Sequence, residues 1–306
     1  MKAVWFRLPA SLRGSLWMIL AGVFFTILSI MIRMASKEVH ILEVVFFRYF
    51  INLIIMLPWL ISIGLQGLKT NNMKFYVARS TCSFLGALCW FAAMALMPLA
   101  EATALGFTTP LFATLGAVLF LSETVRARRW IALLTGFLGT LIILRPGFAV
   151  ITTPAMFAVF GALFIAGSAL FVKVLSRTDS PNTIVLYTGI LATPISLIPA
   201  MFIWVWPTIE GWLWLTGVGA MATFGHLAYT RAFAIADTSA VLPFDYIRLI
   251  FVAIAAFILF GEVPDIWTWI GGGIIGGATI YIAHREAAAA RCIKEPAKSL
   301  PAEGTI

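Results

Sequence analysis

The chain has 306 residues, of which 61% are hydrophobic and 11% charged, and its mean hydropathy is +1.00. Soluble domains carry about 25% charged residues, so this composition excludes a water-soluble fold and predicts a protein solvated by the lipid bilayer. The net charge of +8 comes from basic residues that lie mostly between apolar runs. Basic residues in such positions set membrane orientation, and they do not indicate a nucleic-acid partner.

Ten apolar segments follow one another along the chain. A helix needs about 20 residues to cross the ~30 Å hydrocarbon core of a bilayer. The segments are 14–36, 43–65, 76–97, 100–121, 128–145, 154–175, 182–205, 211–234, 238–260 and 265–284. They predict an all-α integral membrane protein of ten transmembrane helices. Residues 287–306 are small, charged and interrupted by proline, so we expect a disordered cytoplasmic tail there.

The ten segments form two copies of five, because an ungapped shift of 139 residues brings similar landmarks together. Matching pairs are Gly22 with Gly161, Gly86 with Gly225, Trp90 with Tyr229 and Glu123 with Glu262. The repeats are predicted at 14–145 and 154–284. Because each contains an odd number of helices, the second must be inverted in the membrane relative to the first, as in many secondary transporters.

The basic residues predict the orientation. With the N-terminus in the cytoplasm, sixteen of the 21 lysines and arginines fall on the cytoplasmic side and three on the outside. This asymmetry predicts a multi-pass protein of the bacterial inner membrane with both termini cytoplasmic. It also places Glu123 on the cytoplasmic side and Glu262 on the outer side.

The sequence contains none of the motifs that would indicate an enzyme or a direct use of ATP. H-E-x-x-H, G-x-S-x-G and the phosphate-binding loop G-x-x-x-x-G-K-[ST] are all missing. The three cysteines have no metal-binding spacing. We therefore predict no catalytic residue, no cofactor and no metal site.

Polar side chains inside apolar helices are functional candidates, because a charge at bilayer depth costs several kcal/mol. Asp245 and Arg248 lie three residues apart, on one face of the segment 238–260, and can pair. Arg248 is predicted near the midplane, where its planar fork suits a carboxylate, a phosphate or a polarised carbonyl. The alternative is a structural ion pair that ties this helix to a neighbour.

Aromatic residues at equivalent positions of the two repeats suggest the walls of a pocket. Trp90 and Tyr229 are predicted at equal depth, where they can flank a central cavity and stack on a flat ligand, or simply pack in the core. His226, three residues before Tyr229, is either a proton carrier or a satisfied polar residue.

Further polar residues have two readings each. Arg48 is either a gate or substrate contact or a structural anchor, and Tyr187 is its repeat partner. Thr108 precedes Thr109 and Pro110 at a predicted kink, where the hydroxyls either bind freed carbonyls or face a cavity.

Two arginines and a run of glycines are expected to have structural roles. Arg33 and Arg79 are predicted near helix ends, with their charges reaching towards the interface. The glycines from Gly271 to Gly277 predict a close-packed helix seam, within the fold or in a homodimer.

Taken together, these residues resemble the drug/metabolite transporter superfamily, EamA type, over about residues 14–284. The resemblance rests on the ten-helix length, the duplication and four short motifs. These are Phe47-Arg48-Tyr49, Leu121-Ser122-Glu123, Phe260-Gly261-Glu262 and the run from Pro243 to Leu249. It implies that helices one to four and six to nine line a central cavity, with five and ten peripheral. It also implies transport of a small organic solute by exchange, proton coupling or facilitated diffusion.

We therefore predict a secondary transporter that moves a small organic metabolite across the inner membrane by alternating access. The resemblance suggests an amino acid, a nucleotide-like metabolite such as S-adenosylmethionine, or a flavin. Alternatives are an exporter of drugs or metallophores with the same fold, a non-transport scaffold or sensor, a lipid-acting enzyme, or a channel. Expected partners are the solute, the bilayer, a coupled proton or counter-solute, and a second copy through small-residue helix faces.

The repeats differ where the predicted site is charged. Asp245, Arg248 and His226 fall on Gly106, Thr109 and Ala87 of the first repeat. The charged side of the site is therefore predicted to come from the second repeat alone, which favours a ligand with one polar end and one flatter, apolar end.

Overall fold

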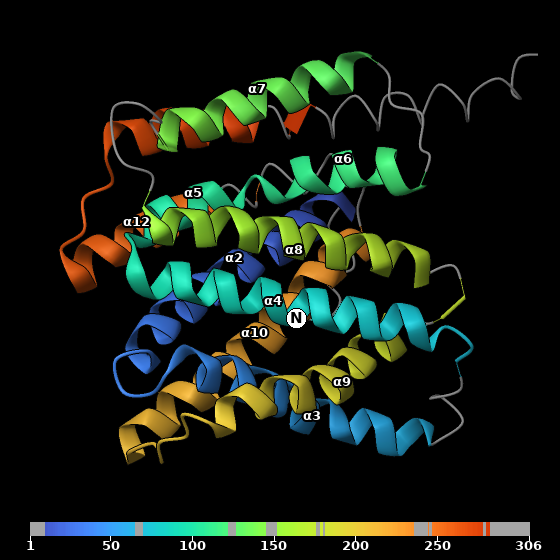
Figure 1. The fold of residues 1–306 in the computed structure, drawn as a ribbon. Helices are drawn as coiled ribbons and strands as arrows, with labels where there is room; N and C mark the ends of the chain where they lie inside the picture. Colours follow the sequence, from blue (N-terminus) through green and yellow to red (C-terminus); the bar gives the residue numbers. More distant parts are fainter. Residues whose placement is uncertain are drawn as a thin grey trace, which may run out of the picture.

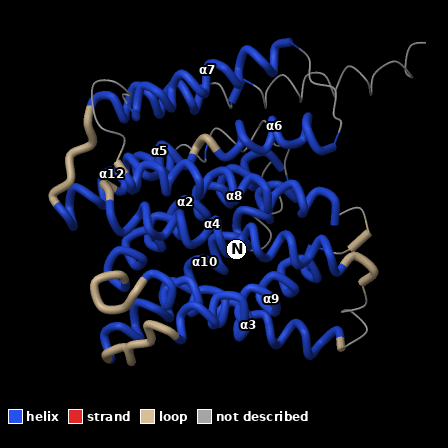
Figure 2. The backbone as a smooth tube through the Cα atoms, in the orientation of Figure 1, coloured by secondary structure: helices blue, strands red, loops and turns tan. Residues whose placement is uncertain are grey.

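The computed structural model describes most of the chain, and within the described residues every regular element is a helix (Figures 1 and 2). The described residues are 10–64, 70–121, 127–144, 152–175, 178–179, 181–235, 244, 247–277 and 280–281. The predicted tail at 287–306 and the predicted acid Glu123 lie outside them.

Helix occupies each of the ten predicted segments. The bounds are α2 Ala10–Ala35, α3 Ile41–Ile63, α4 Met73–Leu96, α5 Leu99–Gly106, α6 Thr109–Leu121, α7 Ala127–Leu144, α8 Thr153–Leu175, α9 Pro181–Met201, α10 Ile209–Ile235, α12 Ile247–Phe260 and residues 266–277. Six of the described stretches are long and apolar enough to cross a membrane, with α5 and α6 counted as one. The all-α membrane fold is thus confirmed. The seventh segment ends at Met201, four residues before its predicted end.

The predicted kink at residues 108–110 is a complete break between α5 and α6. The Thr108 hydroxyl donates to the Leu105 carbonyl at 2.7 Å, and the Thr109 hydroxyl donates to the Gly106 carbonyl at 2.8 Å. A proline removes a backbone donor from the next turn, so carbonyls near it need other partners in an apolar setting. The hydroxyls therefore satisfy the backbone, the first of their two predicted roles.

The helices pack with the symmetry that a duplicated chain requires. Helix α2 packs along α10, and its equivalent α8 packs along α4; likewise α3 meets α10 as α9 meets α4, and α12 meets α2 as α6 meets α8. Matched glycines lie in these contacts. A Cβ on Gly225 would lie 2.7 Å from the Phe25 ring, and one on Gly86 would lie 3.1 Å from the Ile165 nitrogen. Glycine permits this close approach because it has no side chain.

The fifth and tenth helices, α7 and residues 266–277, lie together at one side of the bundle (Figure 1). A Cβ on Gly271 would lie 2.6 Å from the Gly139 carbonyl oxygen, so the two backbones nearly touch. The predicted glycine seam therefore lies within the chain at Gly271. Gly273 and Gly277 have no atom within 4 Å of an added Cβ.

The described connections gather at two ends of the bundle (Figure 2). Residues 36–40, 97–98, 202–208 and 261–265 form one end, which we call the Glu262 end. Residues 70–72 and 178–179 belong to the other, the Asp179 end, where Asp179 accepts hydrogen bonds from Thr70 and Tyr76. Side chains in the middle third of the helices are far from both ends.

Candidate functional site

Arg48 and His226 meet in the interior of the bundle. Arg48 lies seven residues into α3, about 10 Å from its start at 1.5 Å per residue. Its Nη2 lies 3.4 Å from His226 Nε2 of α10. A guanidinium cannot accept a hydrogen bond, so this contact requires a neutral imidazole with its lone pair on Nε2. The Arg48 guanidinium also lies 4.6 Å from the Tyr49 ring centroid and 5.8 Å from that of Phe91.

Arg248 reaches the same region from α12. It lies twelve residues before the end of that helix, about 18 Å along its axis. Its Cβ would lie 3.6 Å from a Cβ on Gly22, so the helix backbone packs directly on α2. Its guanidinium lies 5.6 Å from the Phe25 ring centroid and 5.4 Å from that of Phe107, a favourable cation–π arrangement. Phe25 also packs edge-on against His226, with ring centroids 5.3 Å apart.

Arg79 is a third interior arginine, and sequence reasoning missed it. The expectation that it reaches to the interface is wrong, because its Nη1 donates to the Ile184 carbonyl of α9 at 2.9 Å and its Nε is buried. Helix α4 begins at Met73, three residues before the predicted start. Arg79 therefore lies almost two turns inside the helix. The missed signal is Asn72, which starts the helix before the apolar run becomes continuous.

We call Arg48, Arg79 and Arg248 the central arginine cluster. The positive charges of all three act on His226, and those of Arg48 and Arg79 also act on each other. Each guanidinium has a buried nitrogen with no hydrogen-bond partner: Nε of all three, and also Nη1 of Arg48. An unsatisfied buried donor of a charged group is costly. Four such nitrogens on three arginines that all act on His226 indicate a site for an external acceptor.

Trp90 precedes Phe91, whose ring is near Arg48, and it packs against Gly106, which precedes Phe107. A Cβ on Gly106 of α5 would overlap the Trp90 ring, and a Cβ on Gly161 of α8 would lie 3.0 Å from the Trp90 nitrogen. Gly106 is the repeat partner of Asp245. The indole ring therefore occupies the space that a side chain at Gly106 would need.

The other predicted site residues are more dispersed. Tyr229 packs near Met18 and Ala232, 6.3 Å from Phe25 between ring centroids. Tyr187 is buried against Tyr76 at the Asp179 end, with ring centroids 4.4 Å apart. Thr108 is buried at the break between α5 and α6. Asp245 lies outside the described residues, so its predicted pair with Arg248 stays a prediction.

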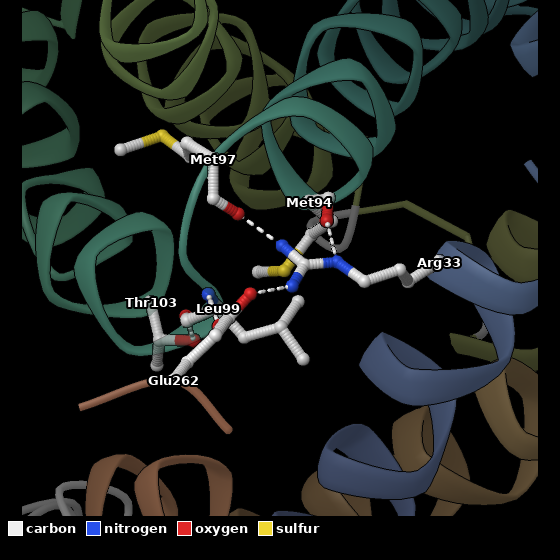
Figure 3. Close-up of polar contacts among 6 residues, drawn as sticks. All are labelled: Arg33, Met94, Met97, Leu99, Thr103 and Glu262. Carbon is white, nitrogen blue, oxygen red and sulfur yellow. Dashed lines mark hydrogen bonds and ion pairs between the residues drawn. The ribbon is translucent and has the colours of Figure 1, made fainter. Parts of the chain in front are cut away.

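A second polar centre closes the Glu262 end of the bundle (Figure 3). Arg33 forms an ion pair with Glu262 and donates to the carbonyls of Met94 and Met97 at the end of α4. The other oxygen of Glu262 accepts from the Leu99 backbone N–H, 2.9 Å away, at the start of α5. We call Arg33 and Glu262 the latch. The expectation that Arg33 extends to the interface is wrong, because it is only 9% exposed.

Gly261 aims Glu262 at its partners. Its φ of +68° is in the left-handed region, which glycine adopts without strain. The Gly261 N–H donates to the Phe257 carbonyl and the Glu262 N–H donates to the Ala256 carbonyl, which ends α12 abruptly. The chain then turns back towards α2 and α5. A groove of about 390 Å³ lies against the latch, with Lys37 and Ile41 also in its wall.

Comparison with known proteins assigns this arrangement to a family. The EamA-like transporter family matches residues 12–145 and 152–283, one match in each half. A riboflavin transporter of Vibrio cholerae is 36% identical over 280 residues, covering 90% of this chain and 94% of the relative. An S-adenosylmethionine uptake transporter of Rickettsia prowazekii is 30% identical, covering 91% and 95%. A pseudopaline exporter of Pseudomonas aeruginosa is 31% identical, covering 89% and 96%.

A solved crystal structure has the same fold. It aligns with a TM-score of 0.64 at 18% identity and covers 89% of this chain and 99% of its own. At that identity the likeness concerns the fold alone.

Proposed function

The chain belongs to the EamA-like transporter family, and from this premise we propose that the central arginine cluster is the site through which it carries a small organic metabolite. The observation that carries the proposal is the set of buried guanidinium nitrogens without partners. A purely structural arginine is expected to be paired, as Arg33 is. Arg48, Arg79 and Arg248 instead each keep a buried donor without a partner.

The proposed mechanism is alternating access. The latch holds α2, the end of α4, the start of α5 and the end of α12 together, which closes the Glu262 end. We propose that the site is reached from the Asp179 end in this conformation, because the latch closes the other end. Rocking of the inverted repeats would open the latch and close the other end.

The location of the protein, its orientation, its substrate and the role of His226 are also part of this proposal. The distribution of basic residues supports an inner-membrane location with both termini in the cytoplasm, so that the latch is external. The chain acts as a carrier without enzymatic activity. The names of the relatives support a small organic metabolite, with uptake of riboflavin or S-adenosylmethionine as examples and export of a pseudopaline-like metallophore as the alternative. His226 contacts Arg48 as a neutral imidazole among three positive charges, which favours the second of its two predicted roles, a satisfied polar residue.

The proposal is tested by replacing Arg248 in the purified protein. We expect Arg248→Ala to lose ligand-induced thermal stabilisation across a metabolite library while it remains folded and membrane-inserted, because the variant removes donors that only the ligand fills. Arg231→Ala is the matched control, since Arg231 is exposed and lies over the Trp17 ring, 5.0 Å from its centroid. Ligand stabilisation equal to wild type in Arg248→Ala would contradict the assigned site.

A further inference from the structure

We propose that the carried metabolite is an anion: a flat aromatic or heteroaromatic ring bearing a carboxylate or a phosphate. This rests on the proposed function of the central arginine cluster and adds to it the charge of the substrate. Neither the family nor the names of the relatives specify that charge.

The first step is a count of charges. The cluster carries three guanidiniums, which remain charged at all physiological pH values. The two acids in the chain between α10 and α12 are Asp237 and Asp245. Even if both carboxylates faced the cluster, one positive charge would remain.

Two carboxylates near these helices, Glu43 on α3 and Asp179 in the connection before α9, each accept a hydrogen bond at an end of the bundle. Glu43, one turn before Arg48, accepts from the Val205 backbone N–H at 3.3 Å, at the Glu262 end. Asp179 accepts from the Tyr76 hydroxyl at 2.7 Å, at the Asp179 end. A buried excess of positive charge is costly unless an anion neutralises it. The ligand is the component that can supply that anion.

The second step is the direction of the free donors. The guanidinium of Arg248 lies between the rings of Phe25 and Phe107, and that of Arg48 lies near Tyr49 and Phe91. Aromatic rings interact with the face of a guanidinium and leave the N–H donors at its edge. The donors without partners are such edge atoms. Edge donors suit the two oxygens of a carboxylate or phosphate.

The third step concerns the flat part of the ligand. Phe25, Phe91 and Phe107 lie near the guanidiniums, and Trp90 is next to Phe91 on α4 and packs against Gly106, which precedes Phe107. Gly106 makes room for the indole ring of Trp90. Rings of this kind stack on planar heterocycles. A small inorganic anion would use the arginines alone, whereas a planar ring with an acidic substituent also contacts Phe25 and Trp90, the two of these rings that are only partly buried.

The experiment compares ligands that share a ring and differ in whether they carry an acidic group. The purified, detergent-solubilised protein is titrated with matched pairs, flavin mononucleotide against riboflavin and nicotinate against nicotinamide, and thermal stabilisation gives the affinities. The panel is extended with other aromatic acids and their amides. We expect an anionic member to bind about ten- to hundredfold more tightly than its neutral partner, as charge-assisted hydrogen bonds imply.

A conservative variant shows whether the arginines set this preference. Arg79→Gln keeps a donor for the Ile184 carbonyl but removes one positive charge. We expect it to reduce the anion preference about tenfold, while Arg231→Gln leaves it unchanged.

Binding by neutral members alone, or equal binding of both members of each pair, would overturn the inference. If that neutral binding were lost in Arg248→Ala, the proposed transport site would still stand. An anion preference unchanged in Arg79→Gln would also contradict the role given to the cluster.

Discussion

The arginines inside this bundle differ in whether their buried donors have hydrogen-bond partners. Arg33 uses its donors on Glu262 and on two backbone carbonyls, so its charge is paired and its geometry fixed. Arg48, Arg79 and Arg248 are half-buried and each keeps a buried donor without a partner. A charge removed from water is tolerated when it is paired and is otherwise kept for function. The difference separates a structural arginine from three candidate binding residues.

An alanine in place of Gly106 tests whether the Trp90 ring forms a wall of the binding site. Gly106→Ala would place its Cβ against the Trp90 ring, so the indole must move. We expect ligand affinity to fall about tenfold while the fold persists, because the wall is displaced and not removed. Affinity is measured by titration of the purified variant. Gly273→Ala, with no atom within 4 Å of its Cβ, is the control; equal affinity in both would argue against Trp90 as a wall.

Site residues could be predicted from the sequence where a polar side chain interrupts an apolar, membrane-spanning segment. Arg248, Arg48 and His226 are polar groups within apolar runs, and the structure brings all three close together. Arg33 and Arg79 were misread because each lies close to the predicted end of a segment, where reaching the interface costs little. Their partners, the Met94 and Ile184 carbonyls, lie on other helices. Contacts of that kind depend on tertiary packing, and they cannot be predicted from the spacing of residues along one helix.

At the scale of elements, two interruptions shape the site. The break between α5 and α6 places Phe107 beside Arg248, and its two threonines satisfy the freed carbonyls. The end of α12 at Gly261 aims Glu262 back at the start of α5. The first repeat has Ser122 at the position that matches Gly261, and the second repeat has Val172 at the position that matches Arg33. The arginine of the latch therefore belongs to one end of the molecule only, and the two ends are expected to open with different ease.

The latch is tested by removing its charge. Glu262→Gln keeps an oxygen for the Leu99 N–H but loses the ion pair with Arg33. In a background without native cysteines, Met94→Cys reports opening, because Met94 is 1% exposed. We expect a membrane-impermeant maleimide to label it about tenfold faster, which corresponds to a latch weakened by about 1.4 kcal/mol.

The matched control for this labelling experiment is Glu210→Gln. Glu210 lies at the same end of the bundle, where it accepts from the indole N–H of Trp214. Its replacement is expected to leave the labelling rate of Met94→Cys unchanged. A Glu262→Gln rate equal to that of this control would contradict the latch.

At the scale of the whole molecule, the duplication explains both the scaffold and the site. Matched glycines such as Gly86 and Gly225 lie in equivalent helix contacts, so the repeat was a good predictor of packing. Charged positions that differ between the copies, Arg248 and His226, lie in the central region instead. The symmetric frame provides the rocking motion that alternating access requires, and the asymmetric residues within it provide recognition.

The central claim is that this frame carries its ligand through the central arginine cluster, and counterflow tests it most directly. Proteoliposomes containing the wild-type protein are loaded with the ligand identified by titration, and entry of the labelled ligand is compared with that into unloaded liposomes. The account predicts that loading accelerates entry and that Arg248→Ala abolishes the acceleration, with Arg231→Ala behaving as wild type. Acceleration that persists in Arg248→Ala would contradict it.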